Sequence, residues 1–176
     1  MGGKEGEVVR DWPPFRLCLP GERPPKTRAL GTAEGVGDRL RAAAFAELQA
    51  REAFRWAGGR FPDAPLSLLK SWEALVSAED RHLGWLIQRM GELGVDAAER
   101  PVSDRLWRSL TACADARAFA LFIAEAEERG RLAGERFRRA LAGDDPTTAA
   151  IFGRIADEEI GHVALARGHF PEPSSS

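Results

Sequence analysis

The chain of 176 residues is long enough for one domain with a substantial hydrophobic core. Hydrophobic residues make up 44% and charged residues 30%, and the formal net charge of -2 gives no general affinity for nucleic acid or acidic membranes. The sequence has no run of about 18 apolar residues that could span a membrane, and its N-terminus lacks the apolar core of a secretory signal. Cys18 and Cys113 lie far apart and in no metal-binding spacing, so we expect reduced thiols and a cytoplasmic protein.

Residues 1–31 are rich in proline, glycine and arginine. Proline fixes φ and lacks a backbone donor, so this composition favours an extended N-terminal arm over a helix. The apolar residues Trp12, Phe15, Leu17 and Leu19 predict that the arm packs against the body of the protein.

The sequence from residue 32 to residue 170 favours helices. Thr32 is a good N-cap for a first helix, which we expect to end near Trp56, before the segment GGRFPDAP. A second helix is expected from about residue 66 to 93, ended by Gly94, and a short one over residues 103–113. Two further long helices are expected at about residues 115–142 and 145–170, the last one begun by an acidic cap and a proline.

No strand-like alternation of useful length occurs in the chain. Four long helices with mostly short connections predict an all-α fold, an antiparallel four-helix bundle over residues 32–170 with one extra short helix between the second and third. Residues 171–176, PEPSSS, are expected to form a disordered tail.

Two of the three histidines follow a glutamate by three residues, and each pair lies in the apolar stripe of a predicted helix. Glu79 precedes His82, and Glu159 precedes His162. Residues three apart share a helix face, so each pair can direct a carboxylate and an imidazole at one point. A charged carboxylate on a core-facing stripe costs several kcal/mol unless it is paired or holds a metal ion.

A further glutamate precedes each of these pairs at the same distance. Glu47 lies 32 residues before Glu79, and Glu127 lies 32 residues before Glu159, so the whole pattern repeats at an offset of 80. The repeat predicts an internal pseudo-twofold made of two helix hairpins. Other pairs are identical at this offset: Ala44 and Ala124, Arg51 and Arg131, Ala53 and Ala133.

Four glutamates and two histidines on four helices are the ligand set of a dimetal carboxylate centre. The predicted metal ligands are Glu47, Glu79, His82, Glu127, Glu159 and His162. We expect Glu79 and Glu159 to bridge two ions and the other two glutamates to bind one ion each. Carboxylates with one imidazole per ion suit two iron ions, with manganese in one or both positions as the alternative. Solvated helix faces with structural ion pairs are the other interpretation of the same pattern.

Several charged residues neighbour the predicted ligands. Arg51 and Arg131 each follow the first glutamate of their half by one helical turn, and the simplest role for them is an ion pair with that or another acid. The alternative role is to hold a metal ligand in place or to anchor an anionic substrate. Asp80, Asp157 and Glu158 adjoin the ligands and could orient the ligand histidines, although we expect solvated positions for most of them.

The same motifs resemble those of the ferritin-like superfamily and, more narrowly, a bacterial ferritin-like family of unknown function. The resemblance spans residues 28–170 and rests on the segments RALGTAEG, AELQAREAF, FPDAP, SAEDRHLGWLIQRMGELGV, EERGRL and AGDDPTTAAIFGRIADEEIGHVALARGHF. It implies a ferritin-like fold with metal ligands at the six positions named above. The superfamily includes a di-iron hydroxylase of a modified tRNA base, although likeness of fold alone does not transfer that activity.

The residue types that are missing narrow the function. The chain has no tyrosine, which argues against a tyrosyl radical, and its two cysteines cannot form a rubredoxin module, so electrons must come from an external donor. We expect an oxidoreductase that activates dioxygen or peroxide and acts on an unidentified small molecule or modified nucleoside. The alternatives are a ferroxidase or peroxide-scavenging protein and a non-catalytic metal-binding scaffold, and a homodimer is compatible with each.

Overall fold

A computed structural model describes residues 10–170, which form five helices and no strand. The helices are α1 (Ala33–Arg60), α2 (Leu66–Glu92), α3 (Arg105–Thr111), α4 (Ala116–Leu141) and α5 (Pro146–His169). The predicted all-α fold and its short extra helix are therefore confirmed. The expected tail at residues 171–176 and the first nine residues of the expected arm lie outside the described residues.

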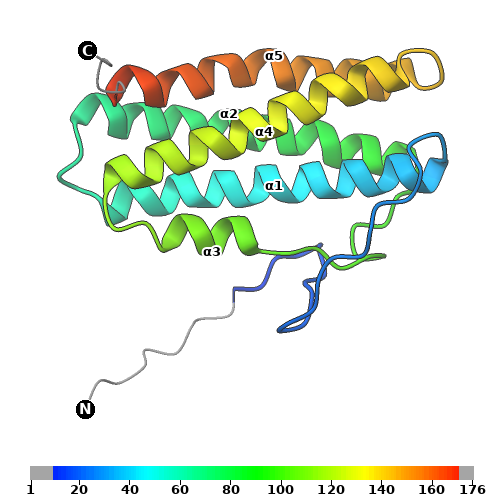
Figure 1. Cartoon of the computed structure of the whole chain (residues 1–176), viewed down its shortest axis with the longest axis horizontal. Coiled ribbons are helices and arrows are strands. Elements are labelled where there is room, and N and C mark those ends of the chain that lie inside the picture. Colours follow the sequence, from blue (N-terminus) through cyan, green and yellow to red (C-terminus); the bar gives the residue numbers. More distant parts are fainter. Residues whose placement is uncertain (1–9, 171–176) are drawn as a thin grey trace, which may run out of the picture.

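The four long helices lie side by side along the long axis of the molecule (Figure 1). Helix α1 packs mainly on α2, and α4 packs mainly on α5, so each half of the sequence repeat forms one helix pair. Helix α3 packs beside α1. Helices α1 and α4 make the sparsest contact of the packed pairs, which leaves space between them. None of the helices described is long and apolar enough to cross a membrane.

Side-chain caps begin three of the long helices. Thr32, Asp115 and Asp145 each accept a hydrogen bond from the backbone N–H three residues later, at 3.0, 2.8 and 3.0 Å. Such caps satisfy N–H groups that have no partner inside the helix. Gly94 follows the end of α2 with a φ of 65°, a conformation that glycine adopts without steric cost.

Helix α1 is longer than the sequence predicts, because Gly58 and Gly59 lie inside it instead of ending it. The N–H of Phe61 still donates to the carbonyl of Ala57 at 3.0 Å, and the Phe61 ring is buried in an aromatic cluster. This packing outweighs the low helix propensity of two glycines. The helix ends where Pro62 disfavours the helical conformation of the residue before it.

The arm packs on the body of the protein through two aromatic rings. Trp12 and Phe15 are 2% and 5% exposed, and their ring centroids lie 5.6 and 5.1 Å from that of Phe45 in α1. Leu17 is half-buried, but the prediction for Leu19 is wrong, because its side chain is 72% exposed. A turn that closes from Leu19 to Glu22 carries the chain away from the core at that point.

A buried ion cluster, which sequence reasoning missed, joins the arm to α1. Asp38 and Arg41 are 5% and 2% exposed, and Arg41 Nη1 donates to Asp38 Oδ1 at 3.0 Å. Arg28 of the arm and Arg100 of the connection after α2 also donate to Asp38. Burial alone would raise the pKa of the Asp38 carboxyl, but these guanidinium groups hold that pKa well below its usual range.

Candidate metal centre

The six predicted ligands meet inside the bundle, near the middle of the four long helices. Helix α1 contributes Glu47, α2 contributes Glu79 and His82, α4 contributes Glu127, and α5 contributes Glu159 and His162. Their ligand atoms form two groups within which all atoms lie no more than 4.8 Å apart. One group is Glu47, Glu79, His82 and Glu159, and the other is Glu79, Glu127 and His162.

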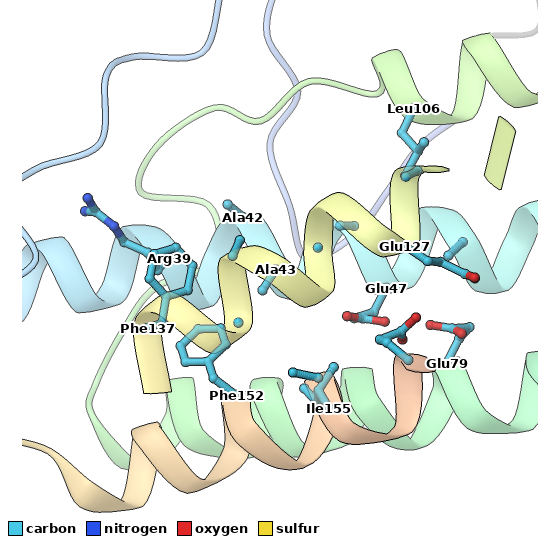
Figure 2. Close-up of a pocket in the computed structure, with 18 of the residues that line it drawn as sticks. Arg39, Ala42, Ala43, Glu47, Glu79, Leu106, Glu127, Phe137, Phe152 and Ile155 are labelled. Carbon is cyan, nitrogen blue, oxygen red and sulfur yellow. The ribbon is translucent and has the colours of Figure 1, made fainter. Parts of the chain in front are cut away.

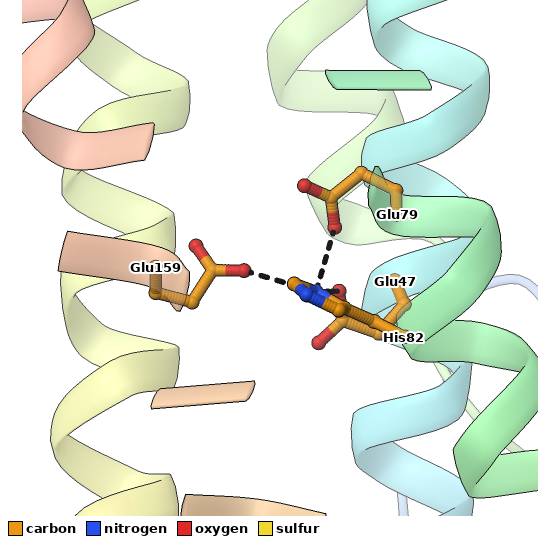
Figure 3. Close-up of side chains that lie close together, drawn as sticks. All are labelled: Glu47, Glu79, His82 and Glu159. Atoms are coloured by element: carbon orange, nitrogen blue, oxygen red, sulfur yellow. Dashed lines mark ion pairs between the residues drawn. The ribbon is translucent and has the colours of Figure 1, made fainter. Parts of the chain in front are cut away.

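Glu79 and Glu159 each turn one oxygen toward each of the two imidazoles, whose rings stack with centroids 5.6 Å apart. Glu159 Oε1 is 3.3 Å from His82 Nδ1, and its Oε2 is 3.4 Å from His162 Nδ1. Glu79 Oε2 is 3.8 Å from His82 Nδ1, and its Oε1 is 3.1 Å from His162 Nδ1. Glu47 completes the first group at 3.6 Å from His82 Nδ1 (Figure 3). Two carboxylates that each reach both imidazoles suit a pair of ions that share ligands.

The cluster is buried, and its polar atoms lack partners. Glu79, His82 and Glu159 are 1%, 0% and 4% exposed. In residues 10–170, five of the six buried side-chain atoms without a hydrogen-bond partner belong to this cluster. Buried polar atoms normally find partners, and this concentration of carboxylate oxygens and imidazole nitrogens suits a metal ion, which accepts electron pairs. The five atoms are Glu79 Oε1, His82 Nδ1, Glu127 Oε1, Glu159 Oε2 and His162 Nδ1.

The charges of the cluster perturb one another. Burial and neighbouring carboxylates raise the pKa values of Glu79 and Glu127 well above their usual range. Burial lowers the pKa of His82, but the surrounding carboxylates, Glu159 first among them, outweigh it and raise that pKa to about 10. These surroundings therefore favour the protonated forms of Glu79, Glu127 and His82, and divalent cations that replaced the protons would balance the charge of the carboxylates.

The histidines differ in what contacts the side of the ring that faces away from the cluster. Glu158 Oε2 lies 2.9 Å from His82 Nε2 and 2.5 Å from a guanidinium nitrogen of Arg81. At the offset of the repeat, the position that corresponds to Glu158 is Ala78, which offers no acceptor to His162. Glu158 thus contacts a predicted ligand, whereas the sequence favoured a solvated position for it over a role in orienting a histidine. Its adjacency to Glu159 and the broken symmetry at position 78 are the only signals that point to it.

Arg51 and Arg131 do not contact the cluster through ion pairs. Arg51 pairs with Glu52 at 3.0 Å and with the exposed Asp80, and Arg131 pairs with Glu128 at 2.7 Å. These contacts match the simpler of the two roles considered for the arginines, namely ion pairs with nearby acids.

A cavity of about 370 Å³ opens between α1 and α4 and reaches the carboxylate side of the cluster (Figure 2). All four predicted glutamate ligands line it, and neither histidine does. Most of the other lining side chains are apolar. A small molecule in this cavity would therefore meet the carboxylates of the cluster and not the imidazoles.

A family model described as "Protein of unknown function (DUF455)" matches residues 10–172. The chain belongs to the DUF455 family. No curated protein and no solved structure matches it significantly. All six residues of the cluster, and Glu158 beside them, lie within the part that matches DUF455, so the candidate centre belongs to the body that defines this family.

Proposed function

We propose that this DUF455 member is a non-haem di-iron carboxylate oxidoreductase of the ferritin-like superfamily, which activates dioxygen or peroxide. The observation that carries the proposal is the set of five buried, unpartnered ligand atoms around two imidazoles. An antiparallel bundle in which two helices supply a glutamate and two supply Glu-x-x-His is the ferritin-like dimetal pattern. The donor set also suits manganese in one or both positions.

Each half of the site holds one ion in this proposal. His82 and Glu47 would hold one ion and His162 and Glu127 the other, with Glu79 and Glu159 within reach of both. When bound, two iron ions would supply the electrons for reduction of dioxygen or peroxide. Glu158 accepts from His82 Nε2–H, which fixes the tautomer and leaves Nδ1 free to bind. The chain itself fixes ligand geometry and limits water around the centre, while reduction requires an external electron donor.

The cavity favours an organic substrate over the alternative roles. It is lined mainly by apolar side chains and meets the carboxylates directly. A ferroxidase or peroxide scavenger needs a path for ions or a small polar oxidant, and a scaffold needs no such space at all. An oxygenase or hydroxylase acting on a small molecule is therefore the form of the proposal that the cavity supports.

Oxygen consumption tests the proposal. Protein loaded anaerobically with ferrous iron is mixed with oxygenated buffer, with and without a chemical reductant, and compared with Glu79→Gln and with Glu73→Gln, an exposed position on the same helix. We expect rapid oxygen consumption and a change in the optical spectrum for wild type and Glu73→Gln, and neither for Glu79→Gln. Sustained consumption with ferrous iron alone would favour the ferroxidase, and inert protein that binds only zinc would contradict the redox function.

A further inference from the structure

The cavity between α1 and α4 has the size of a small-molecule site. Its volume of about 370 Å³ lies toward the low end of the roughly 300–1,000 Å³ found for ligand pockets. Small residues on both helices make the space, among them Ala43 and Ala46 on α1 and Gly130 and Ala133 on α4. The cavity is open because these alanines and glycines have side chains too small to fill the space between the two helices.

The two ends of the cavity differ in chemistry. At one end, Glu79, Glu127 and Glu159 line the wall, each with one buried oxygen that has no hydrogen-bond partner. At the other end lies Arg39, with the rings of Phe137 and Phe152 in between, and its guanidinium points outward, away from the glutamates (Figure 2). Arg39 precedes Glu47 by eight residues on α1, which corresponds to about 12 Å along the helix axis.

Arg39 is the cation at this far end. Its Nη1 donates to the backbone carbonyls of Arg28 and Gly35, and no carboxylate of the described residues lies within ion-pair distance of it. Once metal ions neutralise the carboxylates, Arg39 is the remaining charge on the cavity wall. A guanidinium in such a position recognises carboxylates and related anions.

We propose that this cavity binds an apolar molecule with a single anionic end group, a carboxylate in the simplest case, as the substrate of the metal centre. That this molecule is a substrate, and not only a ligand, rests on the proposed function. The anionic end contacts Arg39, the apolar body lies along Phe137 and Phe152, and the opposite end reaches the carboxylate cluster.

The lining disfavours a nucleoside. Apart from the metal-binding glutamates, Thr27 and Arg39 are the lining residues with polar side chains. The base edges and ribose hydroxyls of a nucleoside would lose hydrogen bonds to water here without gaining replacements, which is costly.

Calorimetric titration of the ferrous-loaded protein under anaerobic conditions tests this assignment, with decanoate, decan-1-ol and adenosine as probes. We expect decanoate to bind at one site per chain, about fivefold more tightly than decan-1-ol, and Arg39→Gln to remove that preference. Gly130→Leu should weaken the binding of both probes at least about tenfold, because the new side chain occupies the cavity. A Cβ at Gly130 meets no atom within 4 Å, and leucine is the better helix former, so this variant should fold.

The matched control is Gly58→Leu, another exposed and sterically open helical position that does not line the cavity, which should bind decanoate like wild type. Equal binding of decanoate and decan-1-ol, a decanoate preference that survives in Arg39→Gln, or unchanged binding by Gly130→Leu would overturn the proposal. Binding of adenosine in place of decanoate would do so too. Iron content is measured on the same samples. If the proposed function fails, the wild type retains no iron, whereas failure of the ligand proposal alone leaves the iron content unchanged.

Discussion

Glu79 illustrates at the residue scale why we interpret the cluster as a metal site and not as a structural ion pair. Its side chain is 1% exposed, and one of its oxygens has no hydrogen-bond partner. Three other carboxylates raise its pKa in addition to burial. A group in these surroundings destabilises the metal-free fold and becomes favourable when a cation binds.

Glu158→Gln should weaken the binding of one of the two ions and leave the binding of the other unchanged. The carboxylate of Glu158 strengthens His82 as a ligand by accepting from Nε2, whereas Ala78 gives His162 no such partner. We expect a loss of roughly tenfold in affinity for one ion in a metal titration. Asp157→Asn, at the exposed neighbouring position, is the control that should leave both affinities unchanged. If Glu158→Gln weakened the binding of both ions equally, the difference between Glu158 and Ala78 would have no effect on metal affinity.

Asp38→Asn should destabilise the protein in a pH-dependent way. The folded state lowers the pKa of Asp38, so its ionised form stabilises the fold above the unfolded pKa of about 3.9, and this contribution is lost as the pH falls toward the lower folded value. We expect the variant to lose roughly 2 kcal/mol of unfolding free energy at neutral pH and the deficit to shrink below about pH 4. Urea unfolding of both proteins at pH 7 and at pH 3 measures the two differences. A deficit of the same size at both values would exclude the ionised carboxylate as its cause.

At the scale of elements, local signals predicted the helix starts, and tertiary packing decided one helix end. Thr32, Asp115 and Asp145 act within one turn of their own position, so sequence alone can place them. The end of α1 depends on the burial of Phe61 against Trp56 and other distant rings, which no local pattern encodes.

Gly58→Ala and Gly59→Ala should each stabilise the protein. Both glycines lie in α1, and a Cβ at either position meets no atom within 4 Å. Alanine reduces the conformational freedom of the unfolded chain, so we expect a gain of about 0.5–1 kcal/mol per substitution in chemical denaturation. Gly94→Ala is the opposite case, because the φ of 65° there strains any other residue, and it should lower the unfolding free energy by about 1 kcal/mol. A loss of stability at position 58 or 59 would mean that the helix does not continue through them.

The sequence predicted the ligands of the candidate site better than the residues around them. Glu47, Glu79, His82, Glu127, Glu159 and His162 came from helical spacing and an internal repeat, and the fold brings these side chains together. The sequence named Glu158 only as one of three acids that could orient the histidines, and it did not identify Arg39 at all. Their positions depend on how α5 is rotated against α2 and on the gap between α1 and α4, which are properties of packing between helices.

At the scale of the whole molecule, the cluster joins the two helix pairs. Ligands from α1 and α2 face ligands from α4 and α5, and the pairs otherwise make only sparse contact. Bound ions would therefore link halves of the bundle whose carboxylates repel each other without metal.

Metal loading should accordingly raise the melting temperature. A free metal concentration of about 100 times Kd stabilises a folded protein by about 2.7 kcal/mol per site, and we expect a rise of at least about 5 °C that chelation reverses. Thermal unfolding monitored by circular dichroism measures the shift. Glu79→Gln should show little of it, and an equal shift in that variant would place the bound ions elsewhere.

Iron stoichiometry tests the central claim most directly. Wild type, Glu79→Gln, Glu159→Gln and the exposed control Glu73→Gln are loaded anaerobically with ferrous iron, freed of excess iron by gel filtration, and measured by elemental analysis. The dimetal centre predicts about two iron ions per chain in wild type and in Glu73→Gln, and a clear loss in the other two variants. Wild-type protein that retains no iron or manganese, or variants that retain as much as wild type, would contradict it.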